Sequence, residues 1–83
     1  MARIEVSDCA IRNAYELFND KLKYRLNQKG RLGYIGNHEA LGIITEEYWE
    51  LIEAIKSNDN AAVKAELIDL IVAAWFALAS SEA

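Results

Sequence analysis

The 83-residue sequence has no proline, one cysteine and one histidine, and each scarcity excludes a class of architecture or site. With Cys9 alone, the chain has no disulfide framework, which is typical of a reducing compartment, so we expect a cytoplasmic protein. A single histidine excludes the paired Glu-x-x-His motifs of di-iron carboxylate bundles, and zinc or haem would also be poor fits. We therefore expect His38 to be an ordinary surface residue.

Long apolar runs and excess positive charge are also missing. The longest apolar stretch, Leu67 to Ala79, is shorter than the about 20 residues of a bilayer-spanning helix and contains Asp69. No signal-peptide core is visible at the start of the sequence. The net charge of −4 argues against nucleic acid or an anionic membrane as a partner. It does not exclude a phosphorylated substrate, because a bound divalent cation reverses the local charge.

What the sequence does contain predicts helices. Alanine, leucine, glutamate and lysine are common and no segment alternates strictly, so we expect an all-α chain forming one domain over residues 1–83. A domain this small buries little surface, so we expect it to contribute three helices to an oligomeric four-helix-type bundle core, as a homodimer or homotetramer. Periodicity and capping residues place the helices at about Ser7 to Gln28, at about His38 to Ser57, and from Asp59 or Asn60 to about Ser80.

The segment between the first two helices is punctuated by three glycines. Gly30 should stop the first helix, and Asn37 is the expected cap of the second. The loop is not a P-loop, because no Gly-Lys-Ser/Thr follows the glycines. Lys29 and Arg31 could reach a phosphate from it, although a plain connection is the more common role of such a segment.

Acidic side chains gather on the second and third helices. Four glutamates share one sector of the second helix, where like charges repel and no lysine intervenes until Lys56. Glu66 and Asp69 lie three apart on the third helix, and after Asp69 no polar residue appears until Ser80, which predicts a buried helix. An unpaired buried carboxylate costs several kcal/mol or becomes protonated. Because no basic residue follows Lys64, we expect a cation from solution to be the partner.

Antiparallel packing of these two helices would place Glu47 and Glu50 opposite Glu66 and Asp69. Four oxygen donors without sulfur or imidazole suit Mg²⁺, with Mn²⁺ as the other option.

The sequence Glu46-Glu47-Tyr48-Trp49-Glu50, then fifteen residues, then Glu66-Leu67-Ile68-Asp69, resembles a known motif. It is similar to the E-E-x-x-E … E-x-x-D pattern of MazG-like all-α nucleoside triphosphate pyrophosphatases, and the similarity extends from about Leu41 to Leu78. The resemblance implies Mg²⁺-dependent hydrolysis between the α and β phosphates, giving a nucleoside monophosphate and pyrophosphate. It implies that the ligands are Glu47, Glu50, Glu66 and Asp69. The catalytic candidates are Glu46 and Glu50, with Glu46 either supporting the metal ligands from behind or assisting the attacking water.

The substrate-binding residues are less evident, because the basic residues that such enzymes carry after the second acidic motif are missing here. The candidates to hold phosphates, from this subunit or another, are Lys29, Arg31, Lys56 and Lys64. Trp49, Tyr34 and Trp75 could stack on a base, although for Trp75 a core position is the better interpretation. Glu53 matches no assigned position and should lie on the surface.

Two alternatives remain open from the sequence. A phosphoribosyl-ATP pyrophosphohydrolase of histidine synthesis has similar motifs, but its basic substrate-binding segments have no counterpart in the first half of this chain. A non-catalytic helical dimer or interaction module is favoured by the missing basic residues. It is opposed by the four-acid cluster, which would be destabilising without a metal.

Overall fold

A computed structural model describes residues 2–83 as three helices, with no strand among them. The helices are α1 (Asp8–Lys29), α2 (Asn37–Lys56) and α3 (Asn60–Ser81). The all-α prediction is confirmed, and the observed ends lie within one residue of the predicted ones. In the described residues, no helix is both long enough and apolar enough to cross a bilayer.

Capping residues explain most of the helix ends. The Ser7 hydroxyl accepts from the Ala10 amide at 3.1 Å, and the Asp59 carboxylate accepts from the Ala62 amide at the same distance. Gly30 ends α1 at φ 79°, a backbone conformation that favours glycine. The prediction of Asn37 as a cap is wrong: α2 begins one residue earlier, with Gly36 at the cap position and no side-chain capping bond. Asn37 is therefore already inside the helix.

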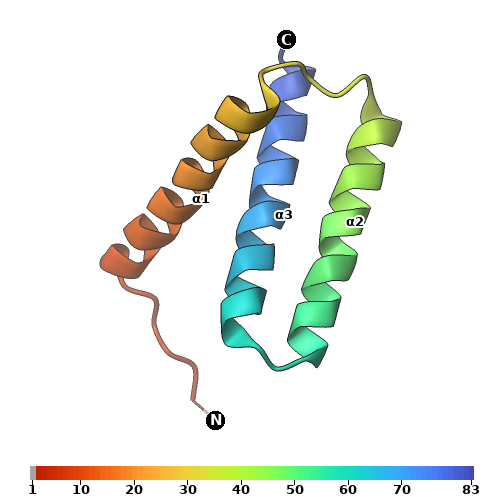
Figure 1. The fold of residues 1–83 in the computed structure, drawn as a ribbon. Coiled ribbons are helices and arrows are strands. Elements are labelled where there is room, and N and C mark those ends of the chain that lie inside the picture. The colour runs from red at the N-terminus through yellow and green to blue at the C-terminus, as the bar shows by residue number, and fades with distance from the viewer. Residues whose placement is uncertain (1) are drawn as a thin grey trace.

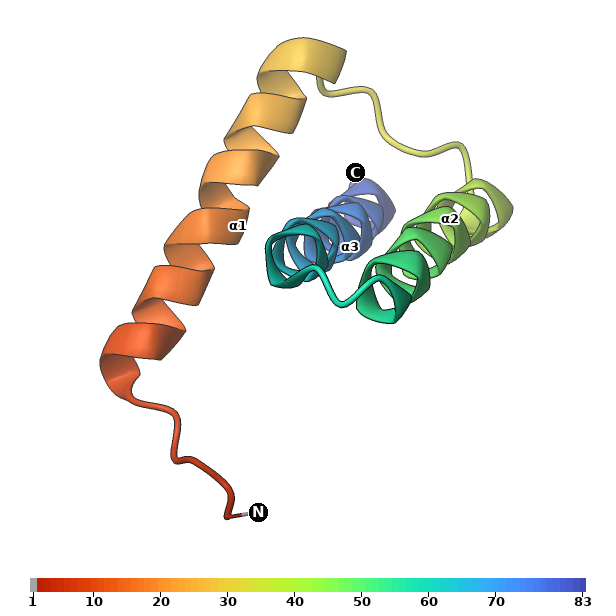
Figure 2. The same ribbon diagram turned by 60° about the horizontal axis from the view of Figure 1, so that its bottom comes forward.

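The central helix of the fold is α3. It packs antiparallel to α2 across the short turn at residues 57–59, and α1 leans across its other side (Figure 1). Seen along the α2–α3 pair, α1 stands apart from α2 at a steep angle (Figure 2). In the described part of the chain, both α1 and α2 contact α3 but have no backbone contact with each other. A gap over α3 therefore separates them, and side chains from all three helices project into it.

The buried core of a single chain is small. Among residues 2–83, only α2 and α3 contribute to it, through the side chains of Leu51, Ala54, Val72, Ala73 and Phe76. The prediction that α3 is buried all round is wrong for the single chain. Leu67, Ile71 and Leu78 are 44%, 43% and 63% exposed, because α1 and α2 cover only two sides of α3.

The loop before α2 is fastened to the end of α3. The Tyr34 amide donates to the Ser80 hydroxyl at 3.1 Å, and this hydroxyl donates to the Phe76 carbonyl at 2.8 Å. The Tyr34 ring also meets the Phe76 ring edge-on at 5.1 Å. A β-carbon on Gly33 would lie 3.1 Å from the Ser80 hydroxyl, so glycine allows this close approach. These contacts fix Tyr34 at the edge of the gap between α1 and α2.

α1 is held more loosely than the hairpin of α2 and α3. No residue of α1 is buried, and one of its contacts with α3 is an edge-on pair of Phe18 with Trp75, with 5.2 Å between ring centres. Trp75 thus packs between α1 and α3, but it is only half-buried and does not belong to the buried core that the sequence interpretation favoured for it. Ile11 and Tyr15, nearer the start of α1, are 57% and 51% exposed.

Candidate functional site

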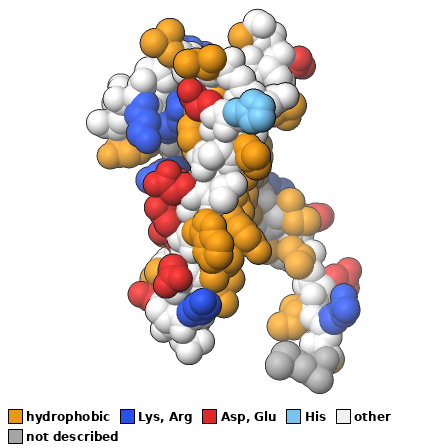
Figure 3. All heavy atoms as spheres, turned by 90° about the vertical axis from the view of Figure 1, so that its right-hand side faces the viewer, with side chains coloured by type: hydrophobic (Ala, Val, Ile, Leu, Met, Phe, Trp, Pro, Cys, Tyr) orange, Lys and Arg blue, Asp and Glu red, His pale blue; other side chains and the backbone are white. Residues whose placement is uncertain are grey.

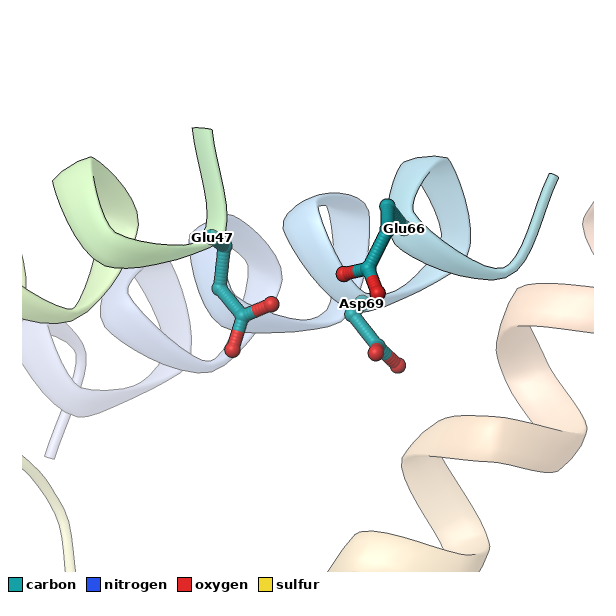
Figure 4. Close-up of side chains that lie close together, drawn as sticks. All are labelled: Glu47, Glu66 and Asp69. Carbon is teal, nitrogen blue, oxygen red and sulfur yellow. The ribbon is translucent and has the colours of Figure 1, made fainter. Parts of the chain in front are cut away.

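Three carboxylates from two helices converge at the α2–α3 contact. Glu47 projects from α2, and Glu66 and Asp69 project from α3; the carboxylates of Glu47 and Glu66 face each other, and Asp69 lies beside Glu66 (Figure 4). One oxygen of each lies within 4.8 Å of the other two, and all three side chains are half-buried. Glu66 and Asp69 are three residues apart and so share one face of α3. The turn at residues 57–59 makes α2 antiparallel to α3, which brings Glu47 to that face.

Burial and mutual repulsion perturb the titration of this cluster. The pKa of Glu47 is raised from 4.5 to about 7, most strongly by burial and then by the nearby charges of Glu50, Asp69 and Glu66, in that order. Burial also raises the pKa of Glu66, followed by the effects of Glu50 and Asp69, whereas Lys21 lowers it. Glu50 is exposed and lies outside the tight group of three, yet it is close enough to act on two of its members.

Two oxygens in the cluster have no partner. Glu47 Oε2 and Glu66 Oε2 are buried and accept no hydrogen bond. Buried polar atoms are normally satisfied, so these two call for a donor or a cation. The group has oxygen ligands only, with no sulfur or imidazole, which is the donor set that Mg²⁺ and Mn²⁺ prefer. The residues present therefore fit a hard divalent cation.

One basic residue reaches the cluster, contrary to the expectation that none would. Lys21 Nζ on α1 lies 3.7 Å from Asp69 Oδ1. The sequence interpretation considered only basic residues near α3 in the chain, whereas this lysine precedes Asp69 by more than one whole helix. Lys21 was thus missed, and so was Arg25 one turn further along α1. A spacing of four residues from Lys21 through Arg25 to Lys29 was the available signal.

A pocket of about 360 Å³ opens beside the carboxylates, between α1 and α2 and over α3. Its walls carry opposite charges. The basic wall is α1, with Lys21, Arg25 and Lys29, and the acidic wall is formed by Glu46, Glu47 and Asp69. The remaining lining residues are Tyr24, Gln28, Tyr34, Ile43, Val72 and Ala73. The pocket can hold an anion on one wall and a cation on the other.

Only some of the residues predicted to bind substrate line this pocket. Lys29 and Tyr34 do, together with the predicted catalytic residue Glu46. Arg31 lies instead in a separate, mostly apolar hollow with Trp75.

The other predicted substrate-binding residues lie outside the pocket. Trp49 is 58% exposed and borders a shallow surface hollow with Glu50, Glu53 and Glu66. Lys56 and Lys64 are exposed near the turn of the hairpin and do not line the pocket. Glu53 and His38 are surface residues, as predicted.

Comparison with known proteins gives one result. Residues 36–83, more than half of the chain, match the family model of the MazG nucleotide pyrophosphohydrolase domain. No curated protein and no solved structure matches the chain significantly. The matched residues contain α2, α3 and all the carboxylates described above, whereas α1 lies outside them.

Proposed function

This chain belongs to the family of the MazG nucleotide pyrophosphohydrolase domain, and we propose that it is a Mg²⁺-dependent enzyme that hydrolyses nucleoside triphosphates between the α and β phosphates. The observation that carries this proposal is the convergence of Glu47, Glu66 and Asp69, with two buried oxygens left unsatisfied. The products would be a nucleoside monophosphate and pyrophosphate. Mn²⁺ is the other cation that this donor set would accept.

The position of each carboxylate suggests its role in this reaction. Glu47, Glu66 and Asp69 would hold the cation, with Glu50 as a fourth ligand from the next turn of α2. When bound, the cation neutralises phosphate charge and acidifies a water. Glu46 lines the pocket one residue before Glu47, so its carboxylate can accept a proton from a water beside the phosphates. Glu50 is the second candidate for that role.

The experiment that tests this function combines melting with product detection. The purified protein is heated with EDTA, with Mg²⁺, and with Mg²⁺ plus each member of a panel of nucleoside triphosphates. We expect Mg²⁺ to raise the melting temperature, because a ligand that binds only the folded state stabilises it. Pyrophosphate release with at least one nucleotide is the second expected result.

Two other outcomes would favour the alternative functions. Phosphoribosyl-ATP belongs in the same panel, and turnover of that compound alone would assign the chain to the related enzyme of histidine synthesis. No metal response and no turnover would overturn the enzymatic proposal in favour of a non-catalytic helical module.

We further propose that the chain functions as a homodimer, formed by the apolar back of the α2–α3 hairpin. On α2 the exposed residues Leu41, Tyr48 and Ile55 recur every seven positions and so form one stripe. On α3 the exposed apolar residues are Leu67, Ile71 and Leu78. Figure 3 shows hydrophobic side chains running along α2 beside a line of acidic ones, which keeps the two surfaces separate.

The exposed area supports a second copy as the partner. The chain exposes 6739 Å², against about 5,000 Å² for a compact monomer of this size. Its radius of gyration is 14.3 Å, against about 12 Å for a compact chain of this length. The excess exceeds the about 800 Å² per partner that a stable interface buries. Two hairpins packed back to back would form a four-helix core and leave both pockets open.

Light scattering of the wild type and of Ile71→Glu tests the assembly. We expect a dimer for the wild type and a monomer for the variant, because a charge in the apolar interface would be buried without a partner. Glu53→Gln, on the acidic face, should remain dimeric. A monomeric wild type would overturn the proposal, and a tetramer would show that further surfaces associate.

A further inference from the structure

Arg25 is the most unusual basic residue of the pocket. Its guanidinium carbon lies 3.6 Å from the centre of the Phe76 ring and 5.8 Å from that of Tyr34. Its Nη1 is buried and has no hydrogen-bond partner. Stacking occupies only the face of a guanidinium and leaves the N–H groups at its edge available as donors. Arg25 is thus held in place by aromatic rings while at least one donor is unused.

The neighbours of Arg25 on α1 extend the same charged wall. Lys21, Arg25 and Lys29 are spaced by four residues and all line the pocket. From Lys21 to Lys29 the helix rises about 12 Å, so the row is longer than a single phosphate needs. Lys21 marks its end at the carboxylate cluster through its 3.7 Å contact with Asp69. A linear polyanion could therefore begin at the cation site and run along α1.

We propose that Arg25, flanked by Lys21 and Lys29, binds the polyphosphate of the substrate, with Arg25 Nη1 donating to a non-bridging phosphate oxygen. This inference rests on the proposed function and names the groups that hold the phosphates in it. Guanidinium–phosphate bonds are charge-assisted and directional, which suits a residue already fixed by Phe76. Since α1 lies outside the residues that match the family, this wall is assigned from the chain's own structure.

A purely structural role for Arg25 is the competing explanation. Arginine stacked on an aromatic ring is common and stabilises helix packing without any ligand. Packing alone, however, does not require an unsatisfied buried Nη1 or two further cations in line with it on the same helix face. Like charges four residues apart repel, so the row is a cost that a bound anion would remove.

Binding of inorganic tripolyphosphate in the presence of Mg²⁺ tests the proposal without any contribution from a base. We expect calorimetry to show about 10- to 100-fold weaker binding by Arg25→Gln than by the wild type, because one charge-assisted contact is lost. Arg25→Lys should fall between them. The matched control is Arg12→Gln, an exposed arginine of the same helix that does not line the pocket. Equal affinities for Arg25→Gln and Arg12→Gln would overturn the proposal.

A measurement on the wild type covers the case in which Arg25→Gln does not fold. In a ¹⁵N-labelled sample with assigned side chains, the Nε–Hε resonance of Arg25 is followed during the tripolyphosphate titration. We expect it to shift with the occupancy of the site, while that of Arg12 stays in place. An Arg25 resonance that does not move at saturation would contradict direct contact.

Failure of this inference can be told apart from failure of the proposed function. If the wild type releases pyrophosphate from nucleotides and Arg25→Gln binds tripolyphosphate normally, the enzyme stands and the role of Arg25 is refuted. If Arg25 governs tripolyphosphate binding but no nucleotide is hydrolysed, the phosphate wall stands and the enzymatic proposal fails. A wild type that does not bind tripolyphosphate refutes the phosphate wall, whatever its activity.

Discussion

The α2–α3 hairpin and α1 contribute opposite halves of the candidate site in different ways. The hairpin carries the carboxylate cluster and, in the described part of the chain, every buried core residue, and it lies within the family match. α1 carries the three cations of the pocket, has no buried residue, and lies outside the match. The candidate metal site thus lies on the hairpin, which holds the buried core, whereas the basic wall lies on α1, which has no buried residue.

This contrast separates two functions that a single pocket must combine. Metal ligands need fixed geometry, and the hairpin supplies it through short-range connection across the turn at residues 57–59. A polyphosphate-binding wall has to admit and release its ligand, and a helix that contacts only α3 can shift without disturbing the carboxylates. The four predictions below test this division, in order of decreasing effect.

The largest effect is expected for Glu66→Gln, which removes one member of the carboxylate cluster. Activity should fall by at least about 100-fold, because even changes to the neighbours of metal ligands cost about 10- to 100-fold. The melting shift caused by Mg²⁺ should disappear. In EDTA the variant should be no less stable than the wild type, because it removes a crowded charge whose pKa is raised.

Glu53→Gln is the matched control for Glu66→Gln, since it removes an exposed carboxylate outside the cluster. It should keep both the activity and the Mg²⁺ response. If Mg²⁺ raised the melting temperature of Glu66→Gln as much as that of the wild type, the metal would not bind at the carboxylate cluster of the hairpin.

Stability without metal should fall as the pH rises through about 7. The pKa of Glu47 is raised from 4.5 to about 7 in the folded chain, chiefly by burial. The folded state therefore holds a proton that the unfolded state releases, so the stabilisation is complete below about 4.5 and is lost above about 7. In EDTA we expect a lower melting temperature at pH 8 than at pH 5.

The contribution of Glu47 is isolated by comparison with Glu47→Gln, in which this decline should be smaller. With Mg²⁺ present, the melting temperature should fall less between pH 5 and pH 8, because the cation competes with the proton and binds more tightly as the pH rises. An EDTA profile of Glu47→Gln identical to that of the wild type would show that Glu47 does not titrate in this range.

Hydrogen exchange should distinguish the two regions directly. We expect the most protected amides in α2 and α3 around Leu51 and Val72, and exchange at least about 10-fold faster along α1, because few buried contacts hold it. Magnesium tripolyphosphate should slow exchange in α1 more than Mg²⁺ alone does. Equal protection of all three helices would remove the contrast drawn above.

The smallest effects on stability are expected at the two capping side chains, Ser7 and Asp59. Asp59→Ala should lower the free energy of unfolding by about 1 kcal/mol, because it leaves an amide at the start of α3 without its partner. Ser7→Ala removes the equivalent bond at the start of α1, where the flanking residues are exposed, and should cost less. Urea unfolding of both variants measures the difference, and a larger loss in Ser7→Ala would contradict it.

The structure of the α2–α3 hairpin could be predicted from the sequence because it depends on local features, namely helix caps, a short turn and residue spacing. Asp59 caps α3, and antiparallel packing across a short turn brings Glu47 to Glu66 and Asp69, whereas Glu50, predicted to join them, lies outside the group of three. The assignment to the MazG family, made from the same acidic motifs, is confirmed by the match.

The basic half of the pocket could not be predicted in the same way. The four-residue spacing is visible in the sequence for Lys21, Arg25 and Lys29. The direction in which this row faces, however, depends on how α1 packs. That direction is set by long-range contacts such as Phe18 with Trp75 and Arg25 with Phe76. No local pattern encodes them. The same ignorance of tertiary packing made α3 look like a fully buried helix.

The central position of α3 also bears on the order in which the protein can fold. α1 and α2 are made first, yet in the described residues they have contacts only with α3. A growing chain that lacks α3 therefore has two amphipathic helices with no apolar surface to pack on, and helices of this length are marginal alone. The hairpin, whose partners are close in sequence, should close first, and α1 should dock afterwards. Synthesis of α3 is thus the step that makes both the core and the pocket possible.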